Sequence, residues 1–193
     1  MKKISLTLVV LGAMGLGTVG SANAANNGKL VFNGTLTNIS CDVGPGTGVG
    51  AGPNGEINVD LGNVSFSDIG SSSQSKLDTA TPIQLLVNCS AGAEQYNTVK
   101  MRFAARNGSG LDNNDQSLLR TTGAADGVGI GLVNAQNRLM DLSGIETIDK
   151  PLVKDGNGGA TAELNFAAVY VLNGTGTNPG NADGFMPFVL DYE

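Results

Sequence analysis

Short runs of apolar residues, most of them alternating with polar ones, recur along this chain. Runs with strand composition cover 31–39, 57–61, 83–87, 99–103, 128–133, 162–172 and 186–193. Because the side chains of a β-strand point alternately to the two faces of a sheet, an alternating run can bury one face and expose the other. The segments between the runs are rich in Gly, Asn, Ser and Pro, which are typical of turns. About seven or eight short strands separated by turns predict an all-β sandwich or barrel.

A helix is compatible with the composition of one segment only. This segment covers 145–150, and Pro151 would end it. We find no internal repeat and no linker that would divide the chain after its N-terminal segment. One β-rich domain is therefore expected.

The last run carries its alternation almost to residue 193. Met186, Phe188, Leu190 and Tyr192 share one strand face. Because chain ends usually fray, an apolar strand at this position needs a partner to pair with. Pro187 has no N–H to donate, so the strand is expected to be bulged there or to pair on one side only.

Residues 1–24 have the pattern of an export signal. A basic start, Met1-Lys2-Lys3, precedes an apolar and small-residue run over 4–19 and the small-x-small sequence Ala22-Asn23-Ala24. A membrane anchor is the alternative, but the run is rich in Gly and shorter than the ~20 apolar residues that a span needs. We expect the mature chain to begin at Ala25.

Charge and cysteine content narrow the function classes. The chain has 17 acidic and 11 basic residues, without a basic cluster. This argues against nucleic acid as a partner and against binding to an anionic membrane surface. Cys41 and Cys89, an even count behind an export signal, predict one disulfide, with two buried free thiols as the alternative.

The chain contains no histidine. This removes Ser-His-Asp and Cys-His catalysis and most catalytic zinc sites. Asp112, Asp115 and Glu163 are nominal candidates for acid–base chemistry. Asp residues in loops are more often turn formers, so we expect no enzyme, no cofactor and no metal site.

An ordered set of short motifs resembles the type 1 pilus (fimbrial) subunits that bacteria assemble by the chaperone–usher pathway. The motifs are Gly-Lys-Leu-Val-Phe-Asn-Gly at 28–34 followed by Cys41, Val-Asp-Leu-Gly at 59–62, Pro-Ile-Gln-Leu at 82–85 before Cys89, the run 166–170, Gly180 as the fourteenth residue from the end, and Tyr192 as the penultimate one. Each motif alone is weak, but their order along the whole mature chain is specific.

The resemblance implies an incomplete immunoglobulin-like sandwich that lacks its last strand and is completed by a donor strand from a neighbouring subunit. It divides the chain into a signal peptide (1–24), a donor-strand extension (25–38) and a pilin domain (39–193). The implied donor face consists of Leu30, Phe32, Gly34 and Leu36, with Gly34 opposite a shallow pocket. An ordinary first strand within its own sandwich is the alternative for these residues.

The resemblance also implies an acceptor groove that a chaperone occupies before assembly. The residues expected in this contact are Gly180, Met186, Phe188, Leu190, Tyr192 and Glu193. Basic residues of the chaperone would hold the carboxylate of Glu193. The disulfide would tie the end of the first strand to the third strand.

The function implied is that of a structural subunit that polymerises by donor-strand exchange into an adhesive surface fibre. Its partners would be other pilin subunits, a periplasmic chaperone, an outer-membrane usher and, for the assembled fibre, host-cell surfaces. The chain would travel through the periplasm to the fimbrium at the cell surface. The alternatives are a minor adaptor or tip subunit that contacts a host ligand, and a small secreted enzyme.

Overall fold

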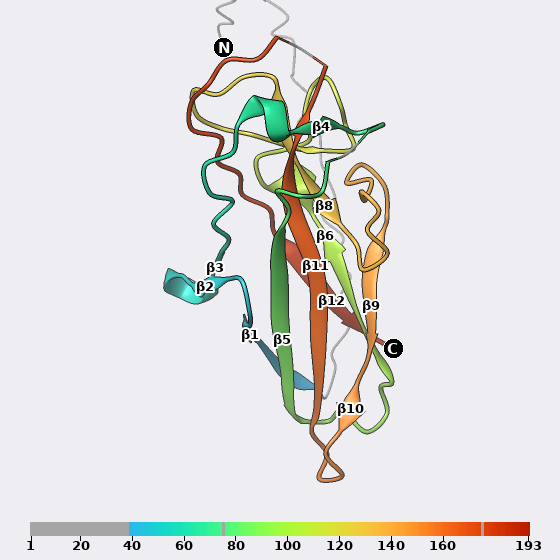
Figure 1. The fold of residues 1–193 in the computed structure, drawn as a ribbon. Coiled ribbons are helices and arrows are strands. Elements are labelled where there is room, and N and C mark those ends of the chain that lie inside the picture. Colours follow the sequence, from blue (N-terminus) through green and yellow to red (C-terminus); the bar gives the residue numbers. More distant parts are fainter. Residues whose placement is uncertain (1–38, 75, 175) are drawn as a thin grey trace, which may run out of the picture. The chain divides into compact units, whose positions relative to one another are not determined.

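The computed structural model describes residues 39–74, 76–174 and 176–193 (Figure 1). The chain divides into two units, Met1–Leu36 and Thr37–Glu193, and all of the described residues belong to the second. The expected signal peptide and donor-strand extension, with Leu30, Phe32, Gly34 and Leu36, lie outside the described residues. The fold below is therefore that of the expected pilin domain.

The described residues form short strands and three 3-10 turns. The strands are β1 (Ser40–Pro45), β2 (Gly50–Ala51), β3 (Ile57–Asn58), β4 (Gly70–Ser71), β5 (Thr81–Ala91), β6 (Thr98–Phe103), β7 (Leu119–Arg120), β8 (Val128–Val133), β9 (Thr147–Pro151), β10 (Val153–Lys154), β11 (Ala160–Leu172) and β12 (Phe188–Tyr192). The 3-10 turns are η1 (Pro53–Gly55), η2 (Phe66–Asp68) and η3 (Ala105–Asn107).

Two sheets form an immunoglobulin-like sandwich. The larger sheet has the order β1-β5-β11-β8-β7, and β4 and β10 also pair with β11. The smaller sheet has the order β12-β6-β9, and β2 pairs only with β3. In Figure 1 the long strands β5 and β11 run side by side, with β6 and β12 in a second layer. This arrangement confirms the all-β sandwich predicted from the sequence.

The main core lies between the two sheets. On β5, alternate residues such as Leu85 and Val87 are buried, as the period-two pattern predicts. They belong to the same hydrophobic cluster as Leu164 of β11 and Val99 and Met101 of β6. The predicted runs 83–87, 99–103, 128–133 and 162–172 all lie within strands of this core.

A second, smaller cluster covers the opposite face of β11. It contains Leu118, Val133, Val169 and Val171. Strand β8 is therefore buried on both faces, and Gly131 on this strand leaves room for its neighbours. A Cβ at this position would lie 2.4 Å from Cδ1 of Leu139 and 3.0 Å from Cγ2 of Val171.

Two expectations about secondary structure are wrong. The helix-permissive segment 145–150 lies largely in β9, because Thr147 and Ile148 pair with β6. Pro151 is the last residue of this edge strand. Leu152 N–H donates to the Asn97 carbonyl, so the nitrogen of Pro151 faces away from β6 and no ladder bond is lost. The run 57–61 is a strand only over β3. Within the described residues, no helix is long and apolar enough to cross a membrane.

Candidate strand-binding groove

Strand β12 pairs with a described strand along one edge only. Its neighbour is β6, in an antiparallel register that sets Phe188 opposite Phe103 and Leu190 opposite Met101. Among the described residues no strand pairs with its other edge, which makes β12 the outer strand of the smaller sheet. An edge of this kind presents N–H and C=O groups to an additional strand.

The hydrogen bonds show which residues of β12 face that open edge. Thr98 and Glu193 exchange both of their backbone bonds, each 2.9 Å long, and Ala104 N–H donates to the Pro187 carbonyl at 2.8 Å. Backbone groups alternate between the two edges of a strand. Residues 187, 189, 191 and 193 therefore face β6, and residues 186, 188, 190 and 192 face the open edge.

Pro187 thus leaves the open edge intact. Its missing N–H lies on the β6 side, at the point where β6 ends, and the register is continuous from Phe188 to Tyr192. The strand is not bulged at the proline, and it pairs on one side only, which was the second of the two outcomes expected. The residues that face the open edge can all donate a backbone hydrogen bond.

The same four residues also carry the apolar face of the strand. Met186, Phe188, Leu190 and Tyr192 are half-buried and pack against the main core. Val189, on the opposite face, is 46% exposed. The alternation in the sequence thus marks the residues whose side chains face the core and whose backbone groups face the open edge.

A cavity of about 870 Å³ lies between the two sheets beside the start of β12. Its apolar lining comes from both layers: Ile83, Leu85, Ile130, Leu132, Phe166 and Tyr170 from the larger sheet, and Met101, Phe103, Met186 and Phe188 from β6 and the terminal segment. The rings of Phe103 and Phe166 meet edge to face across it, with centroids 5.5 Å apart. The segments 57–66 and 179–184 also line it.

The six predicted acceptor residues divide into two groups. Gly180, Met186 and Phe188 line the cavity, whereas Leu190, Tyr192 and Glu193 do not. The Tyr192 ring instead packs edge to face on Tyr96, with centroids 6.3 Å apart. The open space therefore lies beside the N-terminal half of β12.

An end loop, residues 178–183, lies beside the cavity and pairs with 122–126. Asp183 and Thr122 exchange backbone bonds of 2.7 and 2.9 Å, and the Tyr170 hydroxyl donates to the Ala182 carbonyl at 2.8 Å. Partial burial raises the pKa of the Tyr170 phenol. A Cβ on Gly180 would lie 2.7 Å from the backbone of Ala124. Gly180 thus permits the close approach of two backbones, a role that the sequence alone did not indicate.

Ion pairs connect β12 to β6 on the solvent side. Lys100 Nζ lies 2.7 Å from the Glu193 carboxylate, and Arg102 Nε lies 2.5 Å from that of Asp191. The hydrogen bond from Arg102 lowers the pKa of Asp191. The backbone carbonyl of Glu193 accepts from the N–H groups of Thr98 and Asn97. The expected contact of Glu193 with a chaperone stays a prediction.

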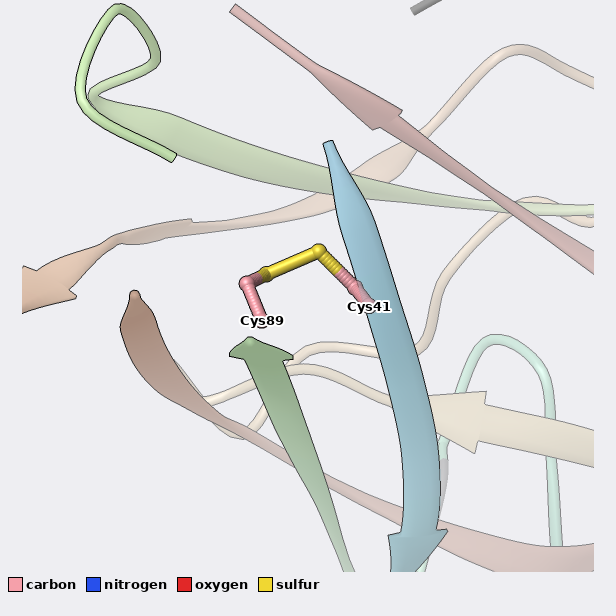
Figure 2. The surroundings of a disulfide bond; sticks show 2 residues. All are labelled: Cys41 and Cys89. Atoms are coloured by element: carbon pink, nitrogen blue, oxygen red, sulfur yellow. A yellow bond between two sulfur atoms is a disulfide. The ribbon is translucent and has the colours of Figure 1, made fainter. Parts of the chain in front are cut away.

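Cys41 and Cys89 form the predicted disulfide, with an S–S distance of 2.04 Å (Figure 2). The two cysteines lie opposite each other on β1 and β5, which are neighbours in the larger sheet. Cys41 is the second residue of β1, so the bond is at the beginning of that strand. The disulfide thus links the start of the described domain to a central strand.

Of the candidate catalytic carboxylates, Asp112 and Asp115 are turn formers, and Glu163 lies on strand β11. Asp112 is 5% exposed and accepts from the N–H groups of Asn114 and Asp115 and from the amide of Asn173. Glu163 accepts from Gln84 on the neighbouring strand. In the part of the chain that the structure describes, no three acidic or cysteine side chains are grouped as metal ligands would be.

The fold and the groove define an immunoglobulin-like β-sandwich protein in which the open edge of β12 lies beside a cavity. The chain belongs to the fimbrial protein family, whose family model matches residues 30–193. This family supplies structural subunits of fimbriae at the cell surface, and membership implies assembly with other pilin subunits.

Among solved structures, the chain is similar to the CupB6 tip adhesin from Pseudomonas aeruginosa, at 21% identity and a TM-score of 0.39. This match covers 57% of the chain and 30% of the adhesin. It is also similar to an antigen and type I fimbria protein of Burkholderia pseudomallei, at 19% identity and a TM-score of 0.43, over 79% of this chain and 100% of that one. No curated protein sequence matches the chain.

Proposed function

We propose that this protein is a structural fimbrial subunit that polymerises by donor-strand exchange into an adhesive fibre. The groove between β12 and the larger sheet accepts a strand from one neighbour, and residues 25–38 fill the groove of another. The observation that carries the proposal is the open edge of β12 beside a cavity of about 870 Å³ that apolar side chains of both sheets help to line.

A β-strand fits this groove on two grounds. Its backbone can pair with the groups of Phe188, Leu190 and Tyr192 that face the open edge, and its alternate side chains can enter the cavity. An open strand edge next to exposed apolar surface is also an aggregation hazard. A periplasmic chaperone that lends a strand before assembly, and an usher that guides the exchange, answer this need.

The donor segment of the same chain has a matching pattern. Leu30, Phe32, Gly34 and Leu36 are every second residue of this segment, so they share one face of an extended strand. A chain that both donates and accepts a strand makes heterologous contacts. Because such contacts need not close into a ring, they generate a filament.

The test compares two neighbouring positions on opposite faces of the donor segment. In the mature chain, we expect Gly34→Tyr to abolish polymerisation, because its side chain points into the groove, and Asn33→Tyr to leave it intact. Polymer length is measured by electron microscopy and size-exclusion chromatography. Equal polymerisation of the two variants would show that the donor face is wrongly assigned.

A mixing experiment shows whether the Gly34→Tyr subunit is folded. Its groove is unchanged, so it can still accept a wild-type donor strand but cannot pass on its own. Added to wild-type subunits, it is expected to shorten the fibres in proportion to its concentration. If a Gly34→Tyr subunit with a wild-type circular-dichroism spectrum leaves fibre length unchanged, the proposal that donor and acceptor are separate parts of one subunit is contradicted.

A further inference from the structure

A second pocket lies outside the groove, between the segment that follows β6 and strand β7. It has a volume of about 290 Å³, and its lining includes Arg106, Arg120, Leu111, Asn113 and Gln116. Leu119 and Arg120 are consecutive residues of β7, and their side chains point to opposite faces. Leu119 lines the groove and Arg120 lines the second pocket, so the two sites share a strand but no side chain.

Both arginines of this pocket are without an ionic partner among the described residues. The other two arginines of the chain each form an ion pair, Arg102 with Asp191 and Arg138 with Glu146. Arg106 and Arg120 are exposed and form no such pair, although acidic residues outnumber basic ones by 17 to 11. Two arginines, both always charged, line one small pocket with a single carboxylate, so its lining residues carry one net positive charge on an acidic protein.

One acidic residue of the pocket, Asp112, offsets part of this positive charge. Its carboxylate forms no ion pair with either arginine, since its oxygens accept from neutral amide groups of its own turn and of Asn173. Oδ1 accepts from the N–H groups of Asn114 and Asp115 at 2.8 and 3.0 Å, and Oδ2 accepts from the Asn173 amide at 3.0 Å.

Backbone hydrogen bonds hold the two arginine-bearing segments together. Gly110 N–H donates to the Ala105 carbonyl at 3.0 Å, and Arg120 N–H donates to the Gly110 carbonyl at 2.9 Å. Ala105 and Leu119, which precede the two arginines, are 2% and 3% exposed and anchor them in the core. Gly110 has φ +88°, and a Cβ there would lie 3.2 Å from Nη2 of Arg120. Glycine therefore lets the guanidinium lie against the loop.

We propose that this pocket binds an acidic sugar residue, with the carboxylate held by Arg106 and Arg120. The planar guanidinium matches a carboxylate through paired hydrogen bonds. The amides of Asn113 and Gln116 can donate to and accept from sugar hydroxyls, and Leu111 offers an apolar surface to the ring. At ~30 Å³ per water, the pocket holds roughly ten waters, which is room enough for one sugar residue.

The probes are glucuronic acid and its neutral counterpart glucose. Each is titrated into the mature chain, and binding is followed by saturation-transfer NMR, which tolerates polymers. We expect saturable binding of glucuronate that weakens with added salt, and no binding of glucose. Arg106→Gln and Arg120→Gln should each weaken binding about tenfold or more, since a hydrogen bond to a charged group is of that size. Arg138→Gln, which removes a paired arginine elsewhere, should not change it.

Three outcomes would overturn the proposal. Equal binding of glucose would show that charge is not recognised, and equal binding of inorganic phosphate would indicate an adventitious ion only. Loss of polymerisation in the Arg106→Gln/Arg120→Gln double variant would assign the pocket to a contact between copies of the chain. Because sugar binding and fibre length are measured separately, failure of this site is distinguishable from failure of the proposed donor-strand mechanism.

Discussion

Strand addition to the open edge of β12 predicts an alternating pattern of amide hydrogen exchange. In a monomer with an empty groove, the N–H groups of Phe188, Leu190 and Tyr192 face solvent, whereas those of Val189 and Asp191 bond to β6. When a donor strand pairs with this edge, the first set becomes hydrogen-bonded and the second set is unchanged. The perturbation is polymerisation itself, and every second residue is an internal control.

The size of the effect follows from the side chains that enter the groove. Leu30, Phe32 and Leu36 each contribute about 1.5–3 kcal/mol when fully buried. Taken at the low end, because ordering the strand opposes binding, the three together give about 4.5 kcal/mol. Each 1.4 kcal/mol is a factor of ten, so exchange at residues 188, 190 and 192 should slow about 10³-fold.

The assay is quenched hydrogen–deuterium exchange. Monomers and polymers are exposed to deuterated buffer, dissolved in an aprotic solvent that stops exchange, and compared residue by residue by NMR. Slowing that is equal at odd and even positions, or stronger at Val189 and Asp191, would refute the assigned edge. Full protection of Leu190 in the monomer would show that the groove is already filled.

Three further changes test what stabilises the domain, by denaturant unfolding of the monomer. Gly131→Ala places a Cβ 2.4 Å from a neighbouring side chain, so it should lower the free energy of unfolding by about 1–3 kcal/mol. The control is Gly44→Ala, whose Cβ has nothing within 4 Å and which should leave stability unchanged. Equal effects of the two substitutions would contradict the close packing on β8. Tyr170→Phe should cost about 0.5–1.5 kcal/mol at neutral pH. Because the pKa of the Tyr170 phenol is raised in the folded state, the stability that the neutral phenol contributes is present below pH ~10 and is lost as the pH rises through the folded pKa. The Tyr170→Phe variant should therefore lose less stability in alkali than the wild type. Equal loss of stability in alkali by the two proteins would argue against a raised pKa. Replacing both Cys41 and Cys89 with Ser should lower the free energy of unfolding by about 4 kcal/mol, because the unfolded chain is then free of a cross-link between residues 48 apart. Unchanged stability would show that removing the cross-link adds little conformational entropy to the unfolded chain.

The sequence predicted the strands whose faces are clearly apolar. Alternation identified β5, β6 and β12, because each has one face on the core and one in solvent. It failed over 145–150, where Glu146, Asp149 and Lys150 resemble a helix surface. Pairing with β6 decides that segment, and pairing partners are not visible in a local pattern.

The candidate strand-binding groove could be predicted only in part, because a local sequence pattern does not reveal which segments come into contact. The inward face of β12 follows from its alternation, and the disulfide follows from two cysteines behind an export signal. The role of Gly180 depends on contact with Ala124, far away in the sequence, and no local pattern predicts it. Pro187 looked like an interruption of the ladder because sequence does not reveal which edge its nitrogen faces.

The position of the cavity implies that strand binding is uneven along the groove. Beside Leu190 and Tyr192 the core is already closed, since the Tyr192 ring packs on Tyr96. Beside Met186 and Phe188 the two sheets leave an open-sided cavity of about 870 Å³. A donor strand therefore gains mainly backbone hydrogen bonds along the C-terminal half of β12 and most of its apolar burial along the N-terminal half. The end loop, held by Tyr170 and by the close approach at Gly180, fixes the shape of that second part. Residues outside the incoming strand's path thus contribute to the groove by keeping its deepest part open and in place.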